Sequence, residues 1–131
     1  MKNLNIKRVC CGIILEDRRV LIARRNDVNF KGLWEFPGGK VMEGESDKAC
    51  LERELMEELN IKTQAGDFFC EVFHSYSGFE IHLLAYYAKI EQGKPKLSEH
   101  SEIEWVSFSD LNNYNFLVAD IPIVDKLSKL Y

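Results

Sequence analysis

The sequence predicts an α+β domain in which a mixed β-sheet is flanked by helices. Apolar and aromatic runs of strand length, several rich in β-branched residues, are separated by turn residues along most of the chain. A central stretch of good helix formers and a C-terminal stretch with apolar residues at helical spacing break this pattern. With 131 residues and 46% hydrophobic composition, we expect one domain, residues 1–131, with a single core.

The N-terminal third is predicted to form a strand pair followed by a loop. Val9–Leu15 and Val20–Ala23 are apolar runs on either side of a turn at Asp17-Arg18. The segment Phe30–Gly44 is rich in glycine and predicts an irregular loop. It retains a tryptophan and a phenylalanine, and loops that keep large aromatic residues often carry function.

A helix is predicted from Ser46 to Leu59. Ser46 can cap its first turn, and Asp47 suits the positive end of the helix dipole. Asn60 tolerates the left-handed conformation that ends many helices.

Two strands and a hairpin turn are predicted to follow this helix. Phe68–Tyr76 and Phe79–Ile90 are rich in aromatic and β-branched residues, and Ser77-Gly78 between them suits a hairpin. Ile103–Phe108 is predicted as a short strand and Ile121–Leu130 as a helix. These elements complete the sheet and its flanking helices.

Composition and charge exclude several classes of function. A net charge of -4 and a pI near 5.4 argue against a surface that binds nucleic acid through many phosphates. The N-terminal apolar run, Val9–Leu15, is too short to span a membrane and has no cleavage site behind it. The four cysteines show no zinc-type spacing, so we expect reduced thiols and a cytoplasmic protein.

The predicted central helix gathers three carboxylates. Residues three and four apart share a helix face, so Glu54, Glu57 and Glu58 point into one volume. Their mutual repulsion would be relieved by a hard divalent cation, and Mg²⁺ commonly binds one or two carboxylates with phosphates and water. The helix can bury a neighbouring apolar stripe against the sheet, namely Leu51, Leu55 and Leu59.

A solvated, glutamate-rich surface is the alternative interpretation of this helix. The upstream residues favour the metal site. Gly38-Gly39, packed among aromatic residues, can bring backbone carbonyls near the same cation, and Glu45 lies just before the helix. Arg53 is placed to orient a neighbouring carboxylate by charge-assisted hydrogen bonds.

The complete pattern resembles the signature motif of the Nudix hydrolase family. Gly39 is followed at the family's spacing by Glu45, Arg53-Glu54-Leu55, Glu57-Glu58 and Asn60-Ile61. The family's penultimate glycine is replaced by Asn60, which also tolerates positive φ. The approach Trp34-Glu35-Phe36-Pro37-Gly38-Gly39 resembles the MutT branch.

The resemblance implies an α/β/α sandwich with a mixed sheet between helices. It implies that Glu54, Glu57 and Glu58, with the carbonyl of Gly38, bind Mg²⁺ or Mn²⁺, while Gly39 and Glu45 shape the motif. The implied reaction releases pyrophosphate from a nucleoside triphosphate and leaves a monophosphate, with the metal acting as a Lewis acid.

The resemblance also implies a further carboxylate in the loop before the last strand. Glu99 and Glu102 lie there, and counting back from Trp105 favours Glu99 as a metal ligand or an activator of water. A solvated loop acid is the alternative. Either Glu54 or Glu99 can serve as the general base, and the sequence does not choose between them.

Three residues are candidates for substrate binding. Arg25 can reach a phosphate or a base edge, or form a surface ion pair, and Phe36 can stack on a base or belong to the core. Asp120 lies in an Ala-Asp-Ile-Pro run that resembles the CTP-cleaving branch of the family. If ionised, it can only accept hydrogen bonds, as from the amine of cytosine, and its alternative role is to cap the last helix.

Two functions therefore remain open. The intact motif favours an enzyme acting on modified triphosphates such as 8-oxo-dGTP or on CTP and dCTP derivatives. The alternative is a catalytically weak sensor that binds a nucleotide without hydrolysing it. The expected partner is a small nucleotide, with no nucleic acid and no membrane, and the protein is expected to be a monomer or a homodimer.

Overall fold

The computed structural model describes residues 5–131 and confirms the predicted α+β class. Its seven-stranded sheet runs in the order β3-β2-β1-β6-β5, with β4 paired to β1 and β7 paired to β2. The strands are β1 (Ile6–Glu16), β2 (Arg19–Arg24), β3 (Trp34–Glu35), β4 (Gly38–Lys40), β5 (Lys62–Tyr76), β6 (Phe79–Gln92) and β7 (Glu102–Ser107). The helices are α1 (Asp47–Leu59) and α2 (Ile121–Leu130), and short 3₁₀ turns span Phe108–Asn113 and Val118–Asp120.

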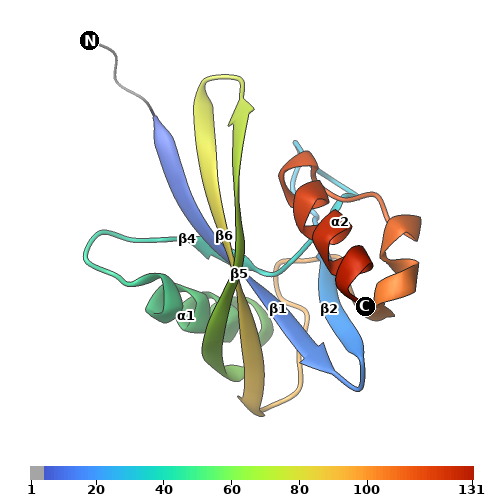
Figure 1. Ribbon diagram of the computed structural model, residues 1–131. Coiled ribbons are helices and arrows are strands. Elements are labelled where there is room, and N and C mark those ends of the chain that lie inside the picture. Colours follow the sequence, from blue (N-terminus) through green and yellow to red (C-terminus); the bar gives the residue numbers. More distant parts are fainter. Residues whose placement is uncertain (1–4) are drawn as a thin grey trace.

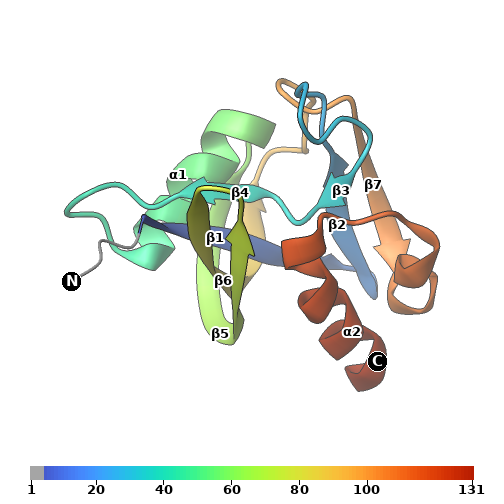
Figure 2. The ribbon, with the colours of Figure 1, turned by 90° about the horizontal axis from the view of Figure 1, so that it is seen from above.

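The sheet is mixed because β1 pairs in parallel with β6, whereas the other strand pairs are antiparallel. Figures 1 and 2 show α1 and α2 on opposite sides of the central strands β1, β5 and β6. Neither α-helix within residues 5–131 combines the length and the apolar character needed to cross a bilayer.

The predicted limits of α1 are confirmed. The Ser46 hydroxyl accepts a hydrogen bond from the Ala49 amide at 3.1 Å, and Asn60 has φ 57° in the left-handed region. The predicted leucine stripe is fully buried on this helix, namely Leu51, Leu55 and Leu59. The glutamates of α1 therefore lie on the other faces of this helix.

The hydrophobic interior consists of two clusters, not the single core expected from composition. One cluster packs α1 against the sheet and includes Ile14, Leu21 and Leu84. The other packs α2 against the opposite side and includes Ile13, Ile22 and Leu83. The difference arises because alternate residues of one strand point to opposite faces, so a sheet between helices separates two cores.

The strand predictions were correct in kind and differ at their ends. The expected hairpin is β5 and β6, but β5 begins at Lys62, six residues before the predicted start. The segment Phe30–Gly44 is not wholly irregular, because it contains β3 and β4. These strands have two and three residues, too few to show a period-2 pattern in the sequence.

Candidate active site

The site is built where β4 crosses between β1 and α1. Gly38 pairs with Cys11, and a side chain at Gly38 would overlap the backbone of Cys10. Gly39 pairs with Cys10, and a Cβ there would overlap the carboxylate of Glu54. The two glycines therefore allow β4 to lie directly against β1 on one side and against the acidic face of α1 on the other.

Arg53 fixes the carboxylates on this face. Its Nε and Nη2 donate to the two oxygens of Glu45 at 2.6 and 3.0 Å. Its Nη1 donates to Glu54 Oε2 at 3.0 Å and to Glu57 Oε1 at 3.2 Å. Hydrogen bonding to Arg53 lowers the pKa of Glu45 to about 2, so this carboxylate is a permanent anchor for the guanidinium.

The surrounding residues do not balance the negative charge that Glu58 carries when it is ionised. Burial, reinforced by the charges of Glu35, Glu54 and Glu99, raises its pKa to about 9. Its Oε1 is buried and has no hydrogen-bond partner among residues 5–131. Burial also raises the pKa of Glu54, although Arg53 opposes the shift. A buried acceptor among like charges is an environment that a cation would stabilise.

The donor set fits a hard divalent cation. Within the described part of the chain, no three acidic, histidine or cysteine side chains already form a closed metal cage. Mg²⁺ seldom requires one, because it retains water and takes ligands from substrate phosphates. The oxygens of Glu54 and Glu58 and the nearby Glu99 charge suit such a partly filled coordination shell, beside the backbone of Gly38, which hydrogen-bonds to Glu58.

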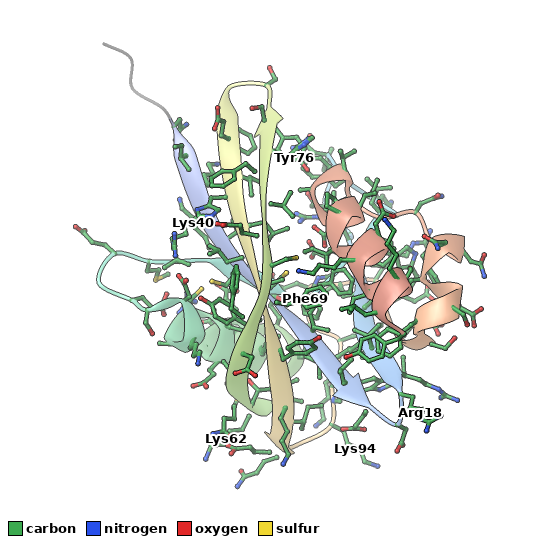
Figure 3. All side chains as sticks on the ribbon, viewed as in Figure 1. Arg18, Lys40, Lys62, Phe69, Tyr76 and Lys94 are labelled. Atoms are coloured by element: carbon green, nitrogen blue, oxygen red, sulfur yellow. The ribbon has the colours of Figure 1, made fainter. Side chains whose placement is uncertain are left out.

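These residues open into a cavity of about 360 Å³. Its wall brings together most of the predicted site, namely Arg25, Phe36, Gly38, Gly39, Glu58, Glu99 and Asp120. Two further lining residues, Lys40 and Tyr76, are labelled in Figure 3 and lie toward α1 and α2 respectively. Glu58 of the predicted acidic cluster and the predicted base-binding residues thus share one cavity, whereas Glu54 and Glu57 lie outside its wall.

Asp120 is buried in this wall, with only 4% of its surface exposed. Its Oδ2 accepts a hydrogen bond from the Phe36 amide at 2.9 Å. Asp120 occupies the N-cap position of α2, but its carboxylate makes no capping bond, so the side chain does not have the alternative role of capping this helix. Burial, together with the charge of Glu35, raises the pKa of Asp120 to about 8. The raised pKa favours the protonated carboxyl near neutral pH, which can donate as well as accept, unlike the ionised group considered from sequence.

A model of the NUDIX domain matches residues 6–127, which is most of the chain. The chain belongs to the Nudix family. It is 36% identical to the CTP pyrophosphohydrolase of Escherichia coli K12 over 123 residues, covering 93% of this chain and 91% of that relative. It is 33% identical to the 8-oxo-dGTP diphosphatase of the same strain, with coverage of 99% and 100%.

Solved structures agree with this assignment. The solution structure of the E. coli ORF135 protein superposes with a TM-score of 0.86 at 34% identity, covering 97% of this chain and 91% of that one. The predicted Nudix fold, an α/β/α sandwich, is therefore confirmed. The protein is a Nudix hydrolase, and the sequence-based identification of the family was correct.

The remaining predicted residues either lie outside the cavity wall of this Nudix site or line it while also making structural contacts. Glu57 is exposed, with 57% of its side-chain surface accessible, and lies outside the cavity wall. Arg25 lines the cavity and also forms ion pairs with Asp27 at 2.7 Å and Glu35 at 3.0 Å. Phe36 is 2% exposed and stacks on Phe116, so its packing role is fulfilled while one face borders the cavity.

Sequence reasoning gave no role to Glu35 and His100, which the fold places in the cavity wall. Glu35 Oε2 lies 2.8 Å from His100 Nε2, and its Oε1 accepts from Arg25. The available signal was a glutamate between Trp34 and Phe36, since a charge between two buried aromatic residues needs a partner.

Proposed function

We propose that this Nudix hydrolase converts a nucleoside triphosphate and water to a monophosphate and pyrophosphate, in a reaction that requires Mg²⁺ or Mn²⁺. The observation that carries the proposal is the uncompensated, buried Glu58 carboxyl next to Glu54 and Glu99, on a cavity that also contains Asp120. Relatives over nearly the whole chain are named a CTP pyrophosphohydrolase and an 8-oxo-dGTP diphosphatase, which supports a triphosphate substrate.

Glu54, Glu57, Glu58, Glu99 and the carbonyl of Gly38 would hold the metal. When bound, the metal would supply Lewis acidity toward phosphate oxygens and lower the pKa of water. The protein groups contribute position and charge. Arg53 keeps two of these carboxylates in place through hydrogen bonds of 3.0 and 3.2 Å, and the Glu45 carboxylate holds Arg53 from behind.

Glu54 and Glu99 remain the two candidates for general base. Each is close enough to the Glu58 carboxyl for its charge to raise that group's pKa. Glu54 is tied to Arg53, which favours its ionised form. Glu99 comes from a loop and lines the cavity itself, so its carboxylate has access to a water beside a bound phosphate.

The base is proposed to bind between Asp120, Arg25 and Phe36. A cavity of about 360 Å³ is within the usual range for small-molecule sites of roughly 300–1,000 Å³. Because Asp120 uses Oδ2 for the Phe36 amide, Oδ1 is the atom left to address a base. A neutral carboxyl there offers a donor to a carbonyl or ring nitrogen, and an ionised one accepts from an exocyclic amine.

The substrates that follow are CTP or dCTP derivatives and oxidised triphosphates such as 8-oxo-dGTP. All four cysteines are free, which is compatible with the proposed cytoplasmic location. The protein is proposed to act as a monomer or a homodimer on a small nucleotide, without nucleic acid or membrane partners.

The test is a screen of canonical and modified triphosphates, including CTP, 5-methyl-dCTP and 8-oxo-dGTP, with pyrophosphate release as the readout. Turnover is expected with Mg²⁺ or Mn²⁺ and should disappear in EDTA. Undiminished hydrolysis in metal-free buffer would contradict the proposal. Tight nucleotide binding without pyrophosphate release, at any metal concentration, would instead support the sensor.

A further inference from the structure

Glu99 lies in the connection between β6 and β7, residues 93–101, and this connection is attached on both sides of it. Ser98 Oγ donates to the Glu58 carbonyl at 2.8 Å, which ties the preceding residue to α1. The following residue, His100, bonds to Glu35 on β3 at 2.8 Å. The Glu99 backbone is therefore held between the helix that carries the acidic cluster and the strand on the other side of the cavity.

The hydrogen bond between His100 and Glu35 lies in the protein interior. The residue is 9% exposed, and its side chain 5%, which is unusual for a histidine in a loop. Because a carboxylate only accepts hydrogen bonds, the contact places a proton on Nε2 of the ring. Nδ1 of the ring is buried with no hydrogen-bond partner among residues 5–131, so the bond from Nε2 to Glu35 is the polar contact that fixes the ring.

Glu35 is itself restrained, so it can serve as a fixed partner. Its second oxygen accepts from Arg25 Nη1 at 3.0 Å, and Arg25 Nε is paired with Asp27 at 2.7 Å. The next residue, Phe36, donates its amide to Asp120. Glu35 and Phe36, at the end of β3, thus hold the Glu99 connection and Asp120 respectively. Both are therefore fixed relative to β3.

We propose that His100 is a positioning residue that acts through Glu99: its bond to Glu35 holds the Glu99 carboxylate at the acidic cluster of α1. Groups that orient a ligand or base from behind typically contribute about 10–100-fold in metal affinity or activity. The inference rests on the proposed role of Glu99, and the experiment below separates the two.

The test compares His100→Leu with His100→Gln. Leucine has a similar size but no donor, whereas the glutamine amide reaches about as far as the ring Nε2 and can still donate to Glu35. His100→Leu is expected to lower kcat and weaken Mn²⁺ binding without nucleotide by about 10-fold or more, with KM nearly unchanged. His100→Gln should restore most of both. If His100→Leu does not fold, His100→Asn, whose amide is too short to reach Glu35, replaces it.

A matched control is available on the sheet. His82 forms a similar pair with Glu71, with 2.6 Å between Nε2 and Oε1, and lies outside the cavity wall. His82→Leu should therefore leave Mn²⁺ affinity and kcat at wild-type values, which shows that losing a histidine–glutamate pair is not enough.

The decisive comparison repeats His100→Leu in a Glu99→Gln background. If His100 acts through Glu99, the second substitution adds little, because the group that it positions is already gone. Equal fold losses in both backgrounds, or wild-type Mn²⁺ affinity and kcat in His100→Leu, would overturn the inference. Should Glu99→Gln alone leave both quantities unchanged, the proposed role of Glu99 is what fails.

Discussion

Alanine at the two adjacent glycines of β4 is expected to affect different properties: Gly39→Ala should lower turnover, and Gly38→Ala should lower stability. In Gly39→Ala the new Cβ would lie 2.6 Å from Glu54 Oε2, whereas ordinary contacts begin near 3.4 Å. Glu54 Cδ and Oε1 would lie closer still, so the carboxylate has to move by at least about 0.8 Å. It is the end of a flexible side chain, so it can swing away, but it then loses its position on Arg53.

In Gly38→Ala the new Cβ would lie 2.6 Å from Cys11 Cα and would also overlap the backbone of Cys10. These atoms belong to β1, at the centre of the sheet, and cannot move without breaking the pairing of β1 with β4. Overpacking of this kind typically costs about 1–3 kcal/mol or more. For a domain of this size, that corresponds to a fall in Tm of roughly 5–10 °C.

Gly39→Ala is expected to keep a Tm near the wild type while kcat falls roughly 100-fold, since a displacement of about 1 Å can have that effect on a positioned group. Pyrophosphate release at saturating Mg²⁺ and thermal melts of both variants measure the two effects. Wild-type turnover in Gly39→Ala, or a Tm as low as that of Gly38→Ala, would refute the assignment of Gly39 to the space of Glu54.

Three other substitutions test the acidic face and the base site. Glu57→Gln should lower kcat strongly with an unchanged Tm, because Glu57 is exposed and its loss relieves repulsion; a loss of soluble protein would indicate a structural role. The pKa of Glu58 rises from 4.5 to about 9 on folding, so the stability of the metal-free protein should fall as pH rises between these values. Thermal melts of Glu58→Gln should show a smaller slope, with the remainder due to Asp120, and an unchanged slope would contradict the burial argument. Asp120→Asn retains an acceptor for the Phe36 amide and adds a donor that does not titrate, so base preference should no longer change between pH 7 and 9. Competing triphosphates in one mixture measure this, and equal slowing of every triphosphate would exclude base recognition by Asp120.

The local features of this protein were determined by sequence alone. Ser46 and Asn60 mark the ends of α1, because capping depends on neighbouring residues and on φ preferences that are local. The same holds for the acidic face of Glu54, Glu57 and Glu58, since helical spacing determines which residues share a side. The motif that these residues form with Gly39 was sufficient to identify the family.

Tertiary structure decided what depends on burial and on contacts between distant residues. Composition implied one core, but the parallel pairing of β1 with β6 and the placement of a helix on each side produced two. The strands β3 and β4 were too short to be recognised in the sequence. Their conformation is imposed by pairing with β2 and β1, which no local pattern encodes.

The same limit applies to the site. Asp120 was identified as a candidate, but its bond to Phe36, 84 residues earlier, and its raised pKa arise only when the cavity wall encloses it. The pairing of Glu35 with His100 spans 65 residues, and no local pattern in either segment indicates the other. The charge state and partners of a buried group depend on desolvation and on neighbouring charges, and both are properties of the folded chain.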